Sequence, residues 1–253
     1  MINILSFIGE PIHFLQNTFV YPPTIKDVIS NPNYFKFLKI LTMSEEDLQD
    51  ELKDYVSPGQ EFPSPFIFLL SNCYKNKEIE KLTSMAFEFF TKEKAIIMYE
   101  EKMIVLFNAN SKQKEKKVLE NLTKITEENF TSLQNIIRIS IGRKPFEPPP
   151  IDPDEDPRVR RIKEKARMRD RIKEKQQSKG KNGISFSQSL IAICCMGIGL
   201  TPLNIGEISY CSVGKIMNAC QAKEAYDLDI QKLMAGADPK KIKPKYWIKE
   251  ISD

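Results

Sequence analysis

Histidine is almost absent from this sequence. The chain has one, His13, and it has no serine or cysteine nucleophile motif to accompany that histidine as a catalytic base. Zinc sites need cysteine and histidine clustered at short spacing, which the adjacent pair Cys194-Cys195 does not supply. Gly197 and Gly199 lack the further glycine, the preceding strand and the downstream Lys-Ser/Thr of a phosphate-binding loop. The sequence therefore predicts a protein that is not an enzyme and that holds no metal or cofactor.

Long apolar runs are also lacking. The longest, Leu190–Leu200, has 11 residues and contains two glycines, whereas a helix needs about 20 apolar residues to cross a bilayer. The first residues, MINILSFIGEPIHF, have neither the basic start nor the cleavage site of a signal peptide. The chain has five cysteines, an odd number, which favours reduced, buried thiols over disulfides. We expect a protein of the cytoplasm with no membrane partner.

Charge is distributed unevenly along the 253 residues. Residues 1–157 carry 18 Lys and Arg against 24 Asp and Glu, a net charge of −6. Residues 158–181 carry 12 against 3, a net charge of +9, and residues 182–253 carry 8 against 7, a net charge of +1. The change of sign follows a proline-rich acidic run, EPPPIDPDEDP, and opens RVRRIKEKARMRDRIKEK. Such a segment cannot build a core, so it predicts a boundary between two folded parts.

The first part, 1–146, is predicted to be an α+β domain that is rich in helix and has two short β-hairpins. The apolar segments Ile2–Ile8 and Ile12–Val20, which Gly-Glu-Pro separates, predict the first hairpin or two packed strands. Ala95–Tyr99 and Met103–Phe107 predict the second. Capping residues and apolar spacing predict helices after Thr24, over Tyr34–Leu41, after Ser44, over 64–73, over Glu78–Phe90 and after Thr126.

The rest of the chain is predicted to form a linker, 147–183, and a small all-α domain, 184–253. The linker combines the proline-rich acidic run with a basic helix. The small domain has apolar helical patterns over Phe186–Gly199 and over about Tyr210–Met234, and Gly236 can close the second helix in a left-handed cap. Its cationic tail carries Trp247, the sole tryptophan.

The basic run has three interpretations. Its Glu164 and Glu174 lie among the cations at spacings that allow pairing within a helix, which favours a solvated charged joint. Its density of Lys and Arg is sufficient to neutralise phosphates, but the run has no aromatic residue on which bases could stack. The third interpretation is docking on an acidic protein surface, of a partner or of the first domain itself. The cations considered for these contacts are Arg158, Arg161, Lys165 and Arg169.

Several strings in both folded parts resemble proteins that are encoded in the tail-gene region of long-tailed bacteriophages of Gram-positive hosts, next to the tape-measure gene. The strings are YPPTIKDV (Tyr21–Val28), FPSPFIFLL (Phe62–Leu70), AFEFFTKEK (Ala86–Lys94), ENFTSLQNIIR (Glu128–Arg138), YDLDIQKLMAGAD (Tyr226–Asp238) and KIKPKYWI (Lys241–Ile248). On this pattern the chain is similar to the tail assembly chaperones of such phages. The length and charge of the basic run depart from that pattern.

The resemblance implies a protein that binds the long, helical, apolar tape-measure protein, keeps it soluble and helps to recruit tail-tube subunits. Many chaperones of this kind have a long form that programmed frameshifting produces. Chaperoning of a helix needs exposed apolar patches, and we expect these along the helices 64–73 and 78–90. The candidate contact residues are Phe66, Phe68, Met85, Phe89 and Trp247, together with the four cations of the basic run. Two alternatives stay open: a phage protein that binds nucleic acid through 158–181, and a structural component of the virion.

Overall fold

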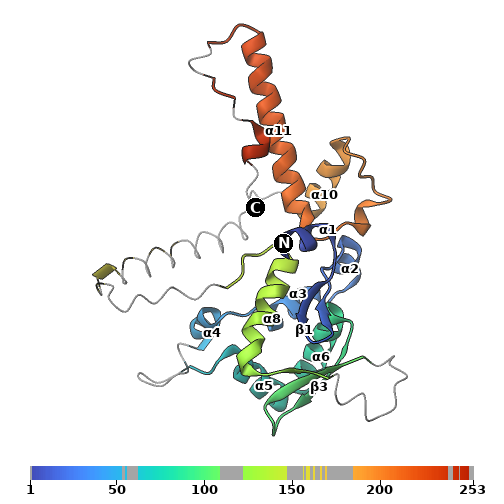
Figure 1. Cartoon of the computed structure of the whole chain (residues 1–253), viewed down its shortest axis with the longest axis vertical. Coiled ribbons are helices and arrows are strands. Elements are labelled where there is room, and N and C mark those ends of the chain that lie inside the picture. The colour runs from blue at the N-terminus through green and yellow to red at the C-terminus, as the bar shows by residue number, and fades with distance from the viewer. Residues whose placement is uncertain are drawn as a thin grey trace. The chain divides into compact units, whose positions relative to one another are not determined.

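The computed structural model describes residues 2–52, 55, 62–108, 122–146, 156, 158–159, 162, 166, 169, 185–238, 242–244 and 246–250. Contacts divide the chain into two compact units (Figure 1). One unit comprises Met1–Phe146 together with Leu200–Asp253, and the other comprises Glu147–Gly199. The chain is rich in helix and has two small sheets, one of two strands and one of three. The predicted boundaries at 146/147 and 183/184 stay predictions.

The chain begins with a helix, α1, over Ile2–Ile8. The prediction that this segment is the first strand of a hairpin is therefore wrong. The hairpin lies entirely within the next segment, where β1 (Ile12–Leu15) pairs antiparallel with β2 (Thr18–Val20). The chain reverses at Gln16, whose φ of 48° is left-handed, and Ile12, Phe14 and Val20 on one face of the hairpin are buried.

The helices that follow begin where the sequence supplies a cap. Thr24 and Asp27 form a capping box at the start of α2 (Ile25–Ser30), and α3 spans Tyr34–Leu41. At α4 (Glu45–Leu52) the Asp47 amide donates to Ser44 Oγ over 3.1 Å and the Ser44 amide donates to Asp47 Oδ2 over 3.4 Å, so aspartate takes the place of the usual glutamate. Ser64 Oγ accepts from an amide in the first turn of α5 (Pro65–Lys75), whose first residue is the tolerated proline.

The second sheet has the strand order β3-β4-β5, with both pairs antiparallel. The hairpin of β3 (Lys94–Met98) and β4 (Met103–Phe107) confirms the prediction. The third strand, β5 (Thr123–Ile125), was not predicted. It pairs Ile125 with Ile104 and places both side chains in the core.

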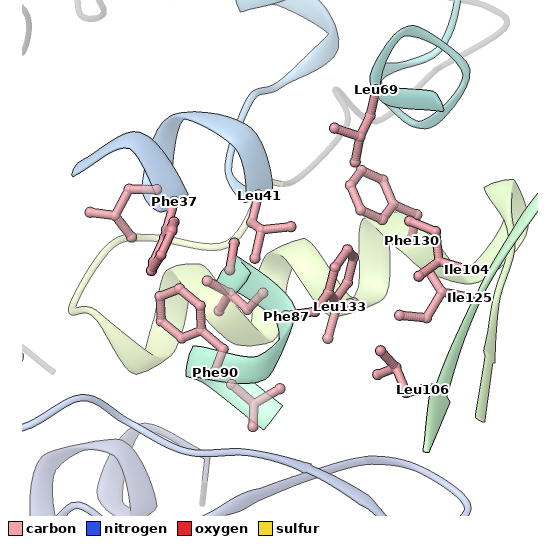
Figure 2. Close-up of a cluster of buried hydrophobic side chains, with 14 of the residues drawn as sticks. Phe37, Leu41, Leu69, Phe87, Phe90, Ile104, Leu106, Ile125, Phe130 and Leu133 are labelled. Atoms are coloured by element: carbon pink, nitrogen blue, oxygen red, sulfur yellow. The ribbon is translucent and has the colours of Figure 1, made fainter. Parts of the chain in front are cut away.

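The core of the N-terminal part is one cluster of apolar side chains that α3, α5, α6 (Lys77–Thr91), α8 (Glu127–Ser140), β4 and β5 contribute. Figure 2 shows Phe87 and Phe90 of α6 beside Leu133 of α8, and Phe130 beside the strand residue Ile104. Beside this cluster, α1, α8 and the β1–β2 hairpin lie side by side.

The described residues from Ser185 onward form two α-helices and two short 3-10 helices. Ser185 caps α10 (Phe186–Cys195), η2 spans Ile205–Glu207, α11 spans Ser212–Met234 and η3 spans Trp247–Glu250. The end of α11 confirms the predicted cap. Gly236 has a φ of 91°, and the amides of Gly236 and Ala237 donate to the carbonyls of Leu233 and Lys232.

Candidate functional site

The aromatic side chains predicted on α5 and α6 belong mostly to the core. Phe66 is 1% exposed and lies 5.2 Å from Phe130 between ring centroids, so it is not at the surface. Phe68 is half-buried. Phe89 is partly buried against the core, with its ring centroid 5.8 Å from that of Tyr34. Met85 is the most exposed of the four, at 37%, and the four do not form a continuous exposed surface.

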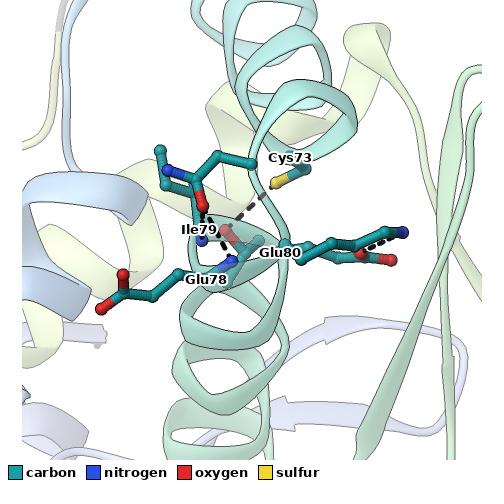
Figure 3. Close-up of polar contacts among 7 residues, drawn as sticks. Cys73, Glu78, Ile79 and Glu80 are labelled. Carbon is teal, nitrogen blue, oxygen red and sulfur yellow. Dashed lines mark hydrogen bonds and ion pairs between the residues drawn. The ribbon is translucent and has the colours of Figure 1, made fainter.

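The junction of α5 and α6 shows what the polar residues in this region do (Figure 3). Asn76 Oδ1 accepts from the amides of Glu78 and Ile79, over 2.9 and 3.4 Å, and so caps α6. The buried Cys73 thiol donates to Thr83 Oγ1 over 3.3 Å, and burial raises the pKa of that thiol. A thiol held in this way is a poor nucleophile, so these contacts position two helices and carry no chemistry.

The predicted contact residues of the later chain are placed in part. The described residues of the basic run, Arg158, Val159, Ile162, Ala166 and Arg169, are helical and exposed. Arg161 and Lys165 lie outside the described residues. Trp247 is half-buried in η3, which lies against α11. Its neighbour Tyr246 is exposed and has its ring centroid 5.9 Å from that of Tyr226 on α11.

A concentration of exposed apolar side chains lies instead on α1. Ile4 is 64% exposed and Ile8 is 58% exposed, and Ile2 and Phe7 are also exposed. The only fully buried side chain of this helix is that of Ser6. A soluble protein normally turns its apolar residues inward and its serines outward, so α1 shows the reverse pattern. Ile4, Phe7 and Ile8 lie at three- and four-residue spacing on the side of the helix away from Ser6, and we name these three residues the α1 apolar face.

Ser6 fixes α1 to two other elements. Its hydroxyl donates to the carbonyl of Ile139 on α8 over 2.8 Å. Its backbone carbonyl accepts from the thiol of Cys211 over 3.1 Å, and Ser6 Oγ and Cys211 Sγ lie 3.0 Å apart. At the next residue of each segment, Ser212 Oγ donates to the carbonyl of Phe7. The α1 apolar face therefore points outward because the opposite side of the helix is held by hydrogen bonds.

Sequence reasoning missed this face because it interpreted Ile2–Ile8 as a strand. The signal that could have revealed it is Gly9, whose φ of 81° lets the Glu10 amide donate back to the carbonyl of Leu5 over 2.9 Å. A glycine directly after an apolar run is a helix-end signal as well as a turn signal. The residues that anchor the helix, Ser6 and Cys211, are 205 positions apart, and no local pattern connects them.

Catalytic and metal chemistry has little support in the described part of the chain. His13 Nε2 lies 2.8 Å from the Gln16 carbonyl, and its exposed ring meets Phe19 edge-on, so it stabilises the hairpin. No group of three or more His, Cys, Asp or Glu side chains is placed to hold a metal ion among the residues described. All five cysteines are free thiols. No described helix is long and apolar enough to cross a membrane.

One small cleft lies at the start of α4 and is lined by Ser44, Glu45, Gln134 and Arg138 among others. Its cavity volume of about 10 Å³ holds about one water molecule, which is too little for a substrate. Its polar groups have structural roles. Gln134 donates to the carbonyl of Met43 over 2.9 Å, and Arg138 Nε donates to the carbonyl of Lys144 over 2.9 Å.

A carboxyl group with a raised pKa lies between the hairpin and the second sheet. Thr18 Oγ1 donates to Glu93 Oε2 over 2.8 Å, and Thr18 Oγ1 also lies 2.7 Å from Thr123 Oγ1. Burial raises the pKa of Glu93, and the hydrogen bond from Thr18 opposes the rise in part. The folded protein therefore binds a proton at Glu93 more tightly than the unfolded chain does, and the ionised group reduces stability at neutral pH.

We expect Glu93→Gln to increase the free energy of unfolding at pH 7. The amide oxygen can still accept from Thr18, and the cost of burying a charge is removed. As the pH falls through the raised pKa towards 4.5, the wild-type carboxyl takes up its proton and the advantage of the variant disappears. Urea denaturation at pH 7 and below pH 4.5 measures the difference. Glu101→Gln, in the exposed turn between β3 and β4, is the control, and an equal gain at both pH values would contradict the prediction.

Comparison of the chain with protein-family models, with curated proteins and with solved structures gives no match. The candidate site therefore rests on the geometry of α1 and of the residues that hold it.

Proposed function

We propose that this protein is a non-enzymatic tail assembly chaperone of a long-tailed phage, a siphovirus, and that it acts in the host cytoplasm during virion morphogenesis. Its partner is the tape-measure protein, and tail-tube protein is a further partner of the same assembly. The class of partner follows from the resemblance of strings such as YPPTIKDV and FPSPFIFLL to proteins of the tail-gene region. The observation that supports a protein-binding role is the α1 apolar face.

An apolar helical partner fits the chemistry of that face. Three large apolar side chains on one side of α1 leave a patch that only another apolar surface covers favourably in water. An amphipathic helix meets such a patch with side chains three and four residues apart. A long helical protein that is apolar enough to aggregate alone presents many stripes of apolar side chains at this spacing. A chaperone needs only to cover these stripes and needs no catalytic group to do so.

Co-expression with the tape-measure gene of the same phage tests the proposal. We expect the tape-measure protein to stay soluble and to co-purify with the wild-type chain. Ile4→Gln combined with Ile8→Gln should weaken the complex at least about tenfold. Burial of one large apolar side chain contributes about 1.5–3 kcal/mol, and 1.4 kcal/mol corresponds to a factor of ten. Both residues are exposed and glutamine is a good helix former, so the fold should survive.

Ile29→Gln is the matched control because Ile29, on α2, is 65% exposed, much like Ile4. It should leave the complex intact if the α1 apolar face is specific. If the tape-measure protein is equally insoluble with and without the wild-type chain, and no complex co-purifies, the chaperone function is rejected. If the complex forms but both variants behave alike, the function stands and the α1 face is the wrong surface.

A second candidate function is binding of nucleic acid through 158–181, and the net charge of +9 over that run favours it. It predicts a gel shift with DNA or RNA at low salt that weakens steeply as salt increases. Deletion of 158–181 should abolish the shift, and binding that is indifferent to the deletion would remove this candidate. Mass spectrometry of purified particles distinguishes the third candidate, since a structural virion component is present there and an assembly chaperone is not.

A further inference from the structure

The segment Ser209–Val213, which we name the strap, crosses the N-terminal part of the chain and ends in the first two residues of α11. It joins that part by a β-bridge between Thr24 and Ser209. The amide of Ile25 donates to the carbonyl of Ile208 over 3.0 Å, and the amide of Tyr210 donates to the carbonyl of Pro23 over 2.8 Å. The Tyr210 ring meets the buried Tyr34 edge-on, with centroids 5.7 Å apart. The strap is thus seated on the N-terminal part independently of α1.

The next residues of the strap hold α1. Cys211 is buried between Ser6 and Gly142, and a Cβ atom on Gly142 would lie 3.2 Å from Cys211 Cβ. The thiol of Cys211 donates to the carbonyl of Ser6, and the hydroxyl of Ser212 donates to the carbonyl of Phe7. Both donors belong to the strap and both acceptors belong to the backbone of α1. The last turn of α1 therefore lies between the strap and α8.

Among the described residues, few further contacts hold α1 in place. Ile4 and Ile8 are largely exposed, Leu5 is half-buried, and Lys215 Nζ of α11 lies 6.0 Å from the centroid of the Phe7 ring. A helix of seven residues is not stable alone in water, because the cost of nucleation exceeds what so few hydrogen bonds return. The helix is thus folded only while it is docked. Its docking depends on Ser6, on the α8 carbonyl and on the two donors of the strap.

We propose that the strap is a clamp that couples the two ends of the chain: α1 stays folded and displays its apolar face only while Ser209–Val213 is seated on the N-terminal part. Because the strap continues directly into α11, a force or partner that pulls α11 away also releases α1. This device is a property of the fold and does not depend on the proposed chaperone function. If that function holds, the strap decides when the α1 apolar face is presented.

Hydrogen exchange on the full-length chain tests the clamp. The amides of Gly9 and Glu10 donate to the carbonyls of Ser6 and Leu5, so their protection reports whether the end of α1 is folded. Cys211→Leu adds bulk where Gly142 and Ser6 leave none and removes the thiol donor. Overpacking of this kind should speed the exchange of the α1 amides and of the strap together by about tenfold or more, with α6 unchanged.

Cys220→Leu is the matched control, since Cys220 is a half-buried thiol on α11 beyond the strap. It should leave exchange in α1 unchanged. Ser212→Ala is the milder second variant: it removes only the hydrogen bond to Phe7 and should speed exchange in α1 by roughly fivefold.

Two results would overturn the clamp: faster exchange in the strap with α1 still protected, or no change in either region for Cys211→Leu. If Cys211→Leu loosens α6 as well, that variant has lost its fold and Ser212→Ala decides the matter. Faster exchange of α1 in Ser212→Ala alone, with α6 protected, then supports the clamp, and unchanged exchange of α1 overturns it.

Discussion

Replacement of Phe87 with alanine should lower the free energy of unfolding by about 3–5 kcal/mol. Phe87 is 0% exposed and lies in the second half of α6, facing the core cluster near Leu133 of α8 (Figure 2). Removal of the ring loses the free energy gained by moving it from water into the core. It also leaves a cavity that the neighbouring side chains of the core cluster would have to move to fill. Domains of this kind are stable by about 5–15 kcal/mol, so the loss is a large share of the total. Urea denaturation followed by circular dichroism measures it.

Met85→Ala is the control on the same helix. Met85 lies two residues earlier and is 37% exposed, so its truncation removes contacts at the rim of the core and should cost less than about 1 kcal/mol. A similar loss for the two variants would mean that α6 does not turn its Phe87 side inward. The comparison also tests the sequence-based expectation that Met85 is available to a partner, because a variant that keeps its stability can be assayed for binding.

Most helix starts were predictable because their signals are local. The hydroxyls of Ser44 and Ser64 accept from amides three residues on, as their spacing from the following residues indicates. The apolar period of α6 predicted the helix but not its buried side, because Thr83, Phe87 and Phe90 are buried whereas Met85 is exposed. The same reasoning also does not work for α5, whose first residues PFIFLL are apolar all round. There the tertiary contact of Phe66 with Phe130 decides that Phe66 is buried while Phe68 is only half-buried.

Sequence reasoning gave the wrong structure for α1 and missed β5, because each of these elements depends on a partner elsewhere in the chain. Ile2–Ile8 is a short apolar segment of a kind that suits a strand, and the helix forms because the backbone of Ser6 and Phe7 finds donors in the strap. Strand β5 has three residues, too few for a pattern, and it exists because β4 presents an edge to it. In both cases the deciding partner lies far away in the sequence, where propensity carries no information.

The candidate site was beyond prediction for the same reason. The sequence offered aromatic and methionine residues on α5 and α6 as a surface, and folding consumes most of them in the core. What it leaves exposed is a helix whose buried residue is a serine. Small residues such as Ser6, Gly142 and Cys211 carry no hydrophobic period, yet they allow α1, α8 and the strap to approach one another closely.

Gly142→Ala should destabilise the protein by about 2 kcal/mol because it meets both strain and crowding. Gly142 ends α8 with a φ of 77°, and the Arg143 amide donates over 2.8 Å to the carbonyl of Arg138, which requires that left-handed turn. The new Cβ would also lie 3.2 Å from Cys211 Cβ, which is closer than most carbon contacts. Urea denaturation measures the loss.

Gly236→Ala separates the two causes. Gly236 ends α11 in the same kind of cap, with a φ of 91°, but nothing lies within 4 Å of the position of its Cβ. The loss in free energy of unfolding for Gly236→Ala should therefore reflect the backbone strain alone, at about 1 kcal/mol. The excess for Gly142→Ala is then the cost of pushing Cys211, and with it the strap, away from α8. If the two losses are equal, the contact between Gly142 and Cys211 is loose enough to yield, and the strap is held by its bridge at Thr24 and not by its close approach to α8.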